Sequence, residues 1–99
     1  MERILEKYPD RVPLYVDKKE GSKVNDIPKH KFLVPKDMTI GNFVYILRKH
    51  IKLESSQALF VFIDNKLVSN SEMIGTVYEQ SRNDDKFLYV IYSIENTFG

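Results

Sequence analysis

Phe87-Leu88-Tyr89-Val90-Ile91-Tyr92 is the stretch of sequence that decides the fold. This run of apolar and aromatic residues predicts a β-strand that is apolar on both of its alternating faces. Such a strand needs cover on both sides. We therefore expect it in the middle of a sheet, where a parallel neighbour is compatible with its pattern.

Residues 40–51 predict the helix that covers one face of this sheet. Thr39 precedes the helix, and its hydroxyl can accept a hydrogen bond from the first helical turn. The apolar residues recur every three or four positions, which predicts one buried stripe. The stripe consists of Ile40, Phe43, Ile46, Leu47 and Ile51.

Shorter apolar runs predict the remaining strands. Residues 12–16 and 31–34 are strands that a polar turn joins into a hairpin. Residues 60–63 form a third strand, and the turn at Asp64-Asn65 lets residues 66–68 pair back against it.

Two short helices complete the pattern. Residues 2–7 form the first, with Ile4 and Leu5 apolar, and Ser71 is the expected N-cap of the second. The resulting order is that of an α+β, ubiquitin-like β-grasp fold, in which a mixed four- to five-stranded sheet packs on a central helix. We expect one domain over residues 1–99, with 94–99 as a flexible tail.

The composition indicates a folded, soluble chain. Of its 99 residues, 42% are apolar and 29% are charged. No apolar run reaches the length of a membrane span and no signal peptide is evident, so we expect a cytoplasmic protein. Because the chain has no cysteine, any thiol chemistry must belong to a partner.

Positive charge is concentrated in the first half of the chain. Residues 1–52 hold 12 Lys and Arg against 7 Asp and Glu, whereas residues 53–99 hold 3 against 7. The net charge of +1 is too small for a dedicated nucleic-acid binder, so no nucleic-acid partner is expected. A locally basic surface is better suited to attracting acidic peptides.

The sequence lacks motifs for catalysis or cofactors. It has neither a phosphate-binding loop nor a dinucleotide fingerprint. His30 and His50 belong to different elements and are expected to be surface histidines, while Asp84 and Asp85 are expected to be solvated acids in a turn. We therefore expect no cofactor, no metal and no enzymatic activity.

The chain ends on Gly99, after the polar tail Glu95-Asn96-Thr97-Phe98. A terminal glycine offers a carboxylate with no side chain around it. Such a carboxylate can enter a narrow enzyme channel, be activated with ATP, and be passed to a thiol and then to an amine. This is ubiquitin-like chemistry.

Six blocks of sequence, in order along the chain, resemble the autophagy ubiquitin-like modifiers. This is the GABARAP and microtubule-associated protein light chain family, also called the autophagy-related protein 8 family. The blocks are Lys7-Tyr8-Pro9-Asp10-Arg11-Val12-Pro13, Lys31-Phe32-Leu33-Val34-Pro35, Phe43-Val44-Tyr45-Ile46-Leu47-Arg48-Lys49, Ala58-Leu59-Phe60-Val61-Phe62, Phe87-Leu88-Tyr89 and Glu95-Asn96-Thr97-Phe98-Gly99.

The resemblance implies that E1-like, E2-like and E3-like proteins join Gly99 to phosphatidylethanolamine, which fixes the protein to the autophagosome membrane. A deconjugating cysteine protease is a further implied partner. The family usually has another N-terminal helix before Glu2, which we expect to be missing here.

The resemblance also implies a groove that binds aromatic-x-x-aliphatic motifs of cargo receptors. Its aromatic pocket would be lined by Ile4, Pro13, Lys31, Leu33 and Phe87. Its aliphatic pocket would be lined by Phe32, Val34, Pro35, Met38, Phe43 and Ile46. Contacts to acidic residues that flank the motif would come from Arg11, Lys29, Lys31 and His50, the last standing where the family usually has an arginine.

Physical chemistry agrees with this groove. Residues 31–34 would form an edge strand that can accept a peptide strand, with alternate side chains entering separate pockets. Two alternatives stay open. One is a ubiquitin-like domain that binds peptides without being conjugated, and the other is a basic scaffold for microtubules, lipid or nucleic acid.

Overall fold

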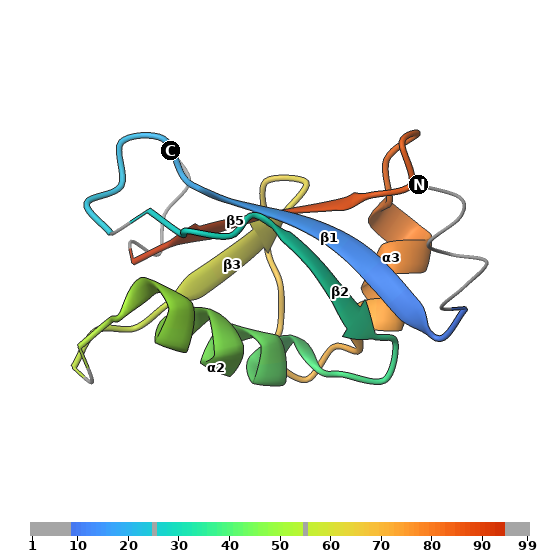
Figure 1. The fold of residues 1–99 in the computed structure, drawn as a ribbon, viewed down its shortest axis with the longest axis horizontal. Helices are drawn as coiled ribbons and strands as arrows, with labels where there is room; N and C mark the ends of the chain where they lie inside the picture. The colour runs from blue at the N-terminus through green and yellow to red at the C-terminus, as the bar shows by residue number, and fades with distance from the viewer. Residues whose placement is uncertain (1–8, 25, 55, 95–99) are drawn as a thin grey trace.

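The computed structural model describes residues 9–24, 26–54 and 56–94. This part of the chain forms five strands and two helices (Figure 1). In order they are β1 (Arg11–Lys18), β2 (Lys31–Pro35), α2 (Ile40–Ile51), β3 (Phe60–Ile63), β4 (Lys66–Leu67), α3 (Ile74–Ser81) and β5 (Leu88–Ser93). The helix expected at residues 2–7 and the tail residues 95–99 lie outside the described residues. Ile94, where we expected the tail to begin, packs against the core.

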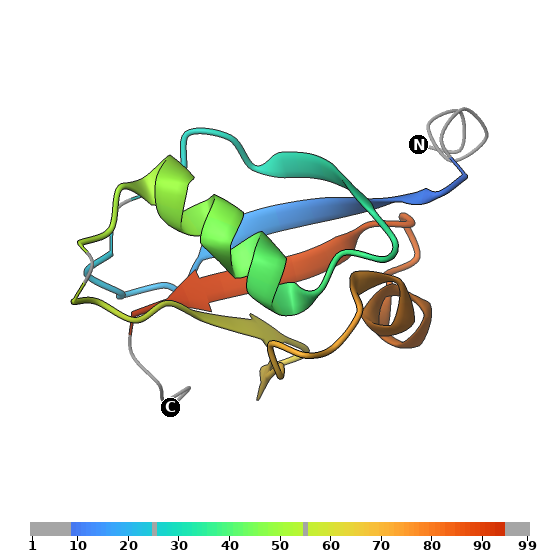
Figure 2. The ribbon, with the colours of Figure 1, turned by 90° about the horizontal axis from the view of Figure 1, so that it is seen from below.

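The five strands form one mixed sheet in the order β2-β1-β5-β3-β4. β5 lies in its centre, parallel to β1 and antiparallel to β3, as the two apolar faces predicted. β1 and β2 make the predicted antiparallel hairpin. Together with the helix that crosses one face of the sheet (Figure 2), this confirms the ubiquitin-like β-grasp fold.

The hairpin of β3 and β4 turns at Asp64 and Asn65, as predicted. Both residues have positive φ, +55° and +64°. Two left-handed residues are what a tight two-residue hairpin requires, and after glycine the short polar side chains of Asn and Asp tolerate that conformation best.

The helix α2 begins as expected. The Thr39 hydroxyl accepts a hydrogen bond from the backbone N–H of Asn42 at 3.2 Å. The buried stripe differs by one residue from the prediction, because Val44 is buried whereas Ile46 is only half-buried. Val44 lies four residues after Ile40 and three before Leu47, so the stripe centres on this line and Ile46 falls on its flank.

The core lies between α2 and one face of the sheet. Alternate residues of the two central strands supply most of it, and α2 closes it from the other side (Figures 1 and 2). The strand residues buried there are Val12, Leu14 and Val16 of β1 and Leu88, Val90 and Tyr92 of β5. The opposite face of the sheet, turned away from α2, is called the outer face below.

The start of α3 corrects one prediction. Met73, not Ser71, is the N-cap residue, and no side chain caps the helix. The first helical N–H groups are bound instead by backbone carbonyls of the β2–α2 connection: Ile74 donates to Met38 at 2.8 Å and Gly75 donates to Lys36 at 2.9 Å. Because these long-range partners satisfy the free donors, a side-chain cap is unnecessary.

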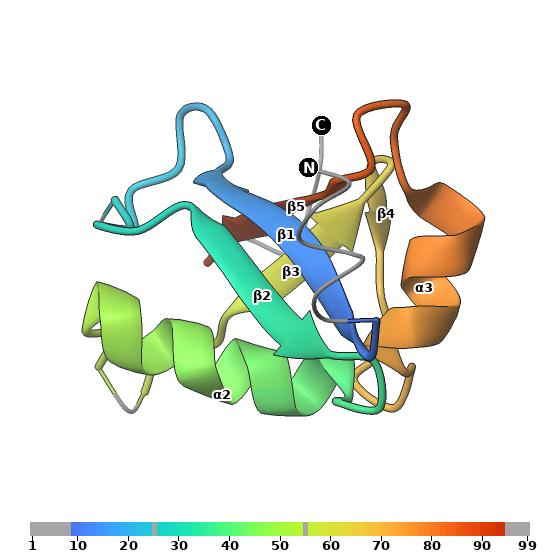
Figure 3. The same cartoon turned by 45° about the vertical axis from the view of Figure 1, so that its right-hand side comes forward.

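α3 therefore sits beside the end of β2 (Figure 3), and the contact is close. A Cβ atom at position 75 would lie 3.0 Å from the carbonyl oxygen and the Cβ of Lys36. Space rather than backbone angle therefore favours glycine at this position.

Candidate functional site

β2 is an edge strand, which confirms the first requirement for adding a peptide strand. The Val16 N–H donates to the His30 carbonyl, and the Lys36 N–H donates to the Asp10 carbonyl. The backbone groups of the even-numbered residues of β2 therefore point toward β1 and bond to it. In an antiparallel ladder the alternate residues face the other way. The backbone groups of Lys31 and Leu33 therefore point to the free edge, and the Leu33 carbonyl there is 3.5 Å from the Arg11 guanidinium.

The residues predicted for the aromatic pocket lie together on the outer face, apart from Ile4, which is outside the described residues. The register pairs Pro13 with Leu33 across the hairpin. Lys31 extends over the start of β5, with its Nζ 5.8 Å from the centroid of the Phe87 ring. Pro13 is buried and the other three keep accessible surface, so Pro13 would form the floor and the others the walls.

The residues predicted for the aliphatic pocket lie mostly on the other side of β2. Phe32 and Val34 point toward the core, and the Phe32 ring meets Phe43 edge to face at 5.5 Å between centroids. Phe43 is 1% exposed, so a ligand on this side of β2 would find accessible side chains in Met38 and Ile46 rather than in Phe43.

Pro35 is the exception in this second set. It pairs with Arg11 at the end of the ladder and therefore shares the outer face with Leu33. Consecutive residues of a strand alternate between faces, so the run Phe32 to Pro35 cannot line a single pocket. The alternation sends Phe32 and Val34 to one side of the edge and Leu33 and Pro35 to the other.

Basic side chains surround this edge. Lys29 Nζ lies 4.9 Å from the centroid of the Phe32 ring, and His50 packs edge to face on the same ring at 5.4 Å. Together with Arg11 and Lys31 on the outer face, Lys29 places positive charge on both sides of β2. The four predicted flank residues thus converge on one strand from β1, the β1–β2 connection, β2 and α2.

Tyr15 and Tyr89 also lie on the outer face, although neither was predicted as a site residue. The ring of Tyr15 lies 6.5 Å from Phe87, 5.6 Å from Tyr89 and 5.6 Å from His30, on which it stacks. Tyr15 follows Pro13 by two residues, so strand alternation alone places both on one face. This signal was available in the sequence.

His30, expected to be a surface histidine, is half-buried and hydrogen-bonded. Its Nδ1 donates a hydrogen bond to the Val16 carbonyl at 2.8 Å, and the ring is half-buried against Tyr15. The stacking follows from the hairpin register, which cannot be read from local spacing.

A second surface feature lies at the far end of the outer face. Asp64, Asp84 and Asp85 line an open depression of about 640 Å³ beside Tyr89. A hydrogen bond from the Tyr89 hydroxyl, with a second from the Phe87 N–H, lowers the pKa of Asp85. All three acids are exposed, as expected for solvated turns, and Asp85 is bonded to its neighbours Phe87 and Tyr89.

Within the described residues, no group of three or more acidic, histidine or cysteine side chains is arranged to hold a metal ion. The described helices are also too short or too polar to cross a membrane. What the site offers is a free strand edge with apolar side chains on both sides and cations around it.

Comparison with known proteins identifies the family. The model of the family described as autophagy protein Atg8, ubiquitin like, matches residues 1–99. Autophagy-related protein 8e of Arabidopsis thaliana is 54% identical over 97 residues, covering 98% of this chain and 80% of that protein. Autophagy-related protein 8 of Schizosaccharomyces pombe is 49% identical over 98 residues, covering 99% and 81% respectively.

A solved structure agrees with the sequence relatives. The crystal structure of Trypanosoma brucei ATG8 matches with a TM-score of 0.91 at 39% identity, over 99% of this chain and 84% of that one. The resemblance carried by the six sequence blocks is thus confirmed along nearly the whole chain. The protein belongs to the Atg8 family of autophagy ubiquitin-like proteins.

Proposed function

We propose that this chain is an autophagy modifier that is conjugated through Gly99 to phosphatidylethanolamine and docks aromatic-x-x-aliphatic motifs of cargo receptors. One observation carries the docking part: the free edge of β2 separates two apolar sets of side chains, Pro13, Leu33 and Phe87 on the outer face and Phe32, Met38 and Ile46 on the other.

An extended peptide added to β2 would meet these two sets with alternate anchors. Its backbone would bond to the outward groups of Lys31 and Leu33, contributing about 0.5–1.5 kcal/mol for each bond. Each buried anchor side chain would contribute about 1.5–3 kcal/mol. Association and ordering offset much of this sum, so affinities on the order of micromolar are expected.

The groove is tested by Leu33→Ala and Phe32→Ala with calorimetric titration of an aromatic-x-x-leucine peptide. Both changes should weaken binding of the peptide. Leu33→Ala should do so without lowering the melting temperature, because Leu33 lies outside the core. Leu67→Ala is the matched control, since Leu67 is an exposed leucine of β4, at the opposite edge of the sheet. If both groove variants bind the peptide as tightly as the wild type, β2 is not the peptide-binding site.

Conjugation is supported by the family match, which extends over Gly99. The carboxylate of Gly99 would be adenylated by ATP with release of pyrophosphate, and an E1-like cysteine would displace AMP to form a thioester. The acyl group would then pass to an E2-like cysteine by thiol exchange, and finally to the amine of the lipid with release of the E2-like thiol. An E3-like partner would assist this last transfer, and a deconjugating cysteine protease would cleave the amide. The cytoplasmic chain would thereby move to the autophagosome membrane.

The test is incubation with the conjugation proteins, ATP and vesicles, followed by intact-mass measurement. Vesicles with phosphatidylethanolamine should give a lipid-sized mass increase, and vesicles of phosphatidylcholine alone should not. Deleting Gly99 should abolish the adduct. A lipid adduct at the end of the shortened chain would show that Gly99 is not the conjugated residue.

A further inference from the structure

A basic pocket lies at one corner of the sheet, where β1 begins, β2 ends and α3 packs beside them (Figure 3). We call it the corner pocket. Its volume of about 270 Å³ is small for a drug-sized ligand and suits a single charged group. Besides Pro9 and Tyr78, its lining holds four basic residues and one acid. The basic residues are Arg11, Lys36, Arg82 and Lys86, and the acid is Glu79.

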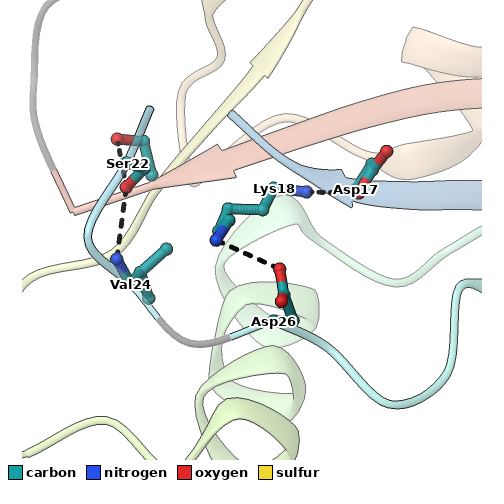
Figure 4. A network of polar contacts seen from close by, with 6 residues as sticks. Asp17, Lys18, Ser22, Val24 and Asp26 are labelled. Atoms are coloured by element: carbon teal, nitrogen blue, oxygen red, sulfur yellow. Dashed lines mark hydrogen bonds and ion pairs between the residues drawn. The ribbon is translucent and has the colours of Figure 1, made fainter. Parts of the chain in front are cut away.

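The positive charge of the corner pocket is poorly neutralised. Glu79 lies 3.6 Å from Arg82, but both side chains are exposed, so this ion pair is weak. Among the described residues, the other three basic residues of the pocket have no carboxylate within ion-pair distance. At the opposite end of β1, by contrast, the Lys18 ammonium lies 3.1 Å from the Asp26 carboxylate (Figure 4). Four positive charges and one negative charge leave the lining at +3, which favours an anion that carries more than one charge.

Tyr78 holds two of these basic residues in place. This tyrosine is 5% exposed, and its hydroxyl donates a hydrogen bond to the Lys86 carbonyl at 2.7 Å. The Arg82 guanidinium lies 5.7 Å from the centroid of the same ring, within the range of a cation–π contact. Both residues are therefore positioned before any ligand arrives, which lowers the ordering cost of binding.

The other two basic residues connect the corner pocket to the free edge of β2. Lys36 directly follows the last residue of this strand, and its N–H donates to the Asp10 carbonyl at 2.9 Å. The Lys36 carbonyl accepts from the Gly75 N–H at 2.9 Å, which ties it to α3. The Arg11 guanidinium lies 3.5 Å from the Leu33 carbonyl on the free edge. A strand that pairs with this edge therefore leads to the corner pocket.

The two apolar sets of side chains give the direction of such a strand. In the aromatic set, Phe87 lies beneath Lys31, the first residue of β2. In the aliphatic set, Met38 comes after the end of β2. A peptide whose aromatic residue precedes its aliphatic residue would thus run parallel to β2. At about 3.3 Å per residue, the positions about two to four residues after the aliphatic anchor would reach Lys36.

We propose that the corner pocket binds a phosphorylated serine or threonine that follows the aliphatic anchor of a docked motif. The inference rests on the peptide groove proposed above. A phosphate group carries about two negative charges and three acceptor oxygens, which suits the charge of the lining better than one carboxylate does. Arg11 and Arg82 can each bind phosphate oxygens through two N–H groups, and the two lysines add point charges. A lipid phosphate has the same chemistry, but the strand edge that leads to the pocket favours a peptide.

Calorimetric titration of the full chain with aromatic-x-x-leucine peptides tests the inference. One peptide is unmodified, three carry phosphoserine at the second, third or fourth residue after the leucine, and one carries it before the aromatic residue. We expect at least one downstream phosphate to raise the affinity about five- to twentyfold, because it gains several charge-assisted contacts at the surface.

Arg82→Gln together with Lys86→Gln is the principal variant. It should lose most of the gain from the downstream phosphate and bind the unmodified peptide within about twofold of the wild type, since the groove residues are unchanged. Phosphoserine before the aromatic residue should keep its effect. Lys36→Gln, whose side chain is exposed, should lower the downstream gain by itself.

Lys23→Gln together with Lys66→Gln is the matched control, because it removes two exposed lysines outside the corner pocket. An equal loss of the gain in this control would attribute it to net charge and overturn the pocket. The pocket is also overturned if the wild type binds the unmodified peptide but no downstream phosphopeptide more tightly. A wild type that binds none of the peptides overturns the groove itself, and the inference with it.

Vesicles of phosphatidylcholine with a phosphatidylinositol phosphate test the lipid source of the same chemistry. If Arg82→Gln together with Lys86→Gln abolishes binding to these vesicles while no phosphopeptide gains affinity, the ligand is a lipid headgroup and the peptide assignment is wrong.

Discussion

Tyr92 is the largest fully buried side chain of β5, and its phenol makes stability depend on alkaline pH. Burial, assisted by the carboxylates of Asp26 and Asp17, raises the pKa of Tyr92 to about 12, with a partial lowering by a hydrogen bond that the phenol oxygen accepts from the Ile27 backbone. An unfolded tyrosine titrates near pH 10. The folded state therefore retains a proton that the unfolded state loses between these two values.

The resulting prediction concerns the sign of the pH dependence. The contribution of Tyr92 to the free energy of unfolding is complete below about pH 10 and is lost as pH rises toward 12, on the order of 2–3 kcal/mol in all. Denaturant unfolding of the wild type and of Tyr92→Phe across this range checks it. The variant should be less stable near neutral pH but should lose less stability above pH 10.

Tyr45→Phe is the control for that measurement, because Tyr45 is 61% exposed and its removal should leave the alkaline slope as in the wild type. An equal loss of stability above pH 10 in Tyr92→Phe and in the wild type would contradict a buried, protonated phenol.

At the scale of elements, the predictable parts are those whose pattern is local. The two apolar faces of residues 87–92 gave the central strand, and the three-and-four spacing of residues 40–51 gave α2 with its Thr39 cap. Each of these patterns reflects what the element itself buries. The site residues on β2 came from the family resemblance, and strand alternation then assigns their faces and separates Pro35 from Phe32 and Val34.

The unpredicted parts depend on partners distant in the sequence. Ser71 is a good capping residue, but Met38 and Lys36 already bind the first amides of α3, so the helix begins two residues later than expected. Likewise the stacking of His30 on Tyr15 follows from the register of the hairpin. Local sequence carries no information about either contact.

The contact between α3 and the end of β2 makes a prediction about Gly75→Ala. In an exposed helix this change stabilises by about 1 kcal/mol. Here the new Cβ would meet the Lys36 carbonyl at 3.0 Å, so the backbone must shift, at a cost of about 1–3 kcal/mol. The second effect wins, and we expect net destabilisation together with weaker peptide binding, because Met38 is displaced with Lys36.

Thermal unfolding and calorimetry measure these two effects. Gln80→Ala is the control, since Gln80 is an exposed position of the same helix and the change should be neutral or slightly stabilising. A more stable Gly75→Ala with unchanged peptide affinity would show that α3 does not constrain the end of β2.

At the scale of the whole molecule, two regions of the surface differ in the sign of their charge. Cations gather around β2 and the end of α2, while Asp64, Asp84 and Asp85 lie at the other end of the outer face. The imbalance of charge between the two halves of the sequence thus becomes a difference between two regions of the surface. A peptide with acidic flanks is attracted to the first region and repelled from the second, which favours one orientation on the edge of β2.

The salt dependence of peptide binding distinguishes a peptide groove from a scaffold that binds by charge alone. Two peptides with the same aromatic-x-x-leucine motif, one with acidic and one with neutral flanks, should be titrated at about 0.05 M and 0.5 M salt. Raising the salt should weaken the acidic peptide about three- to tenfold and leave the neutral one nearly unchanged, because its anchors are apolar. Lys29→Gln together with Lys31→Gln should remove most of that difference. A scaffold that binds by charge alone would instead hold the acidic flanks equally well after the motif's aromatic and leucine are replaced by alanine.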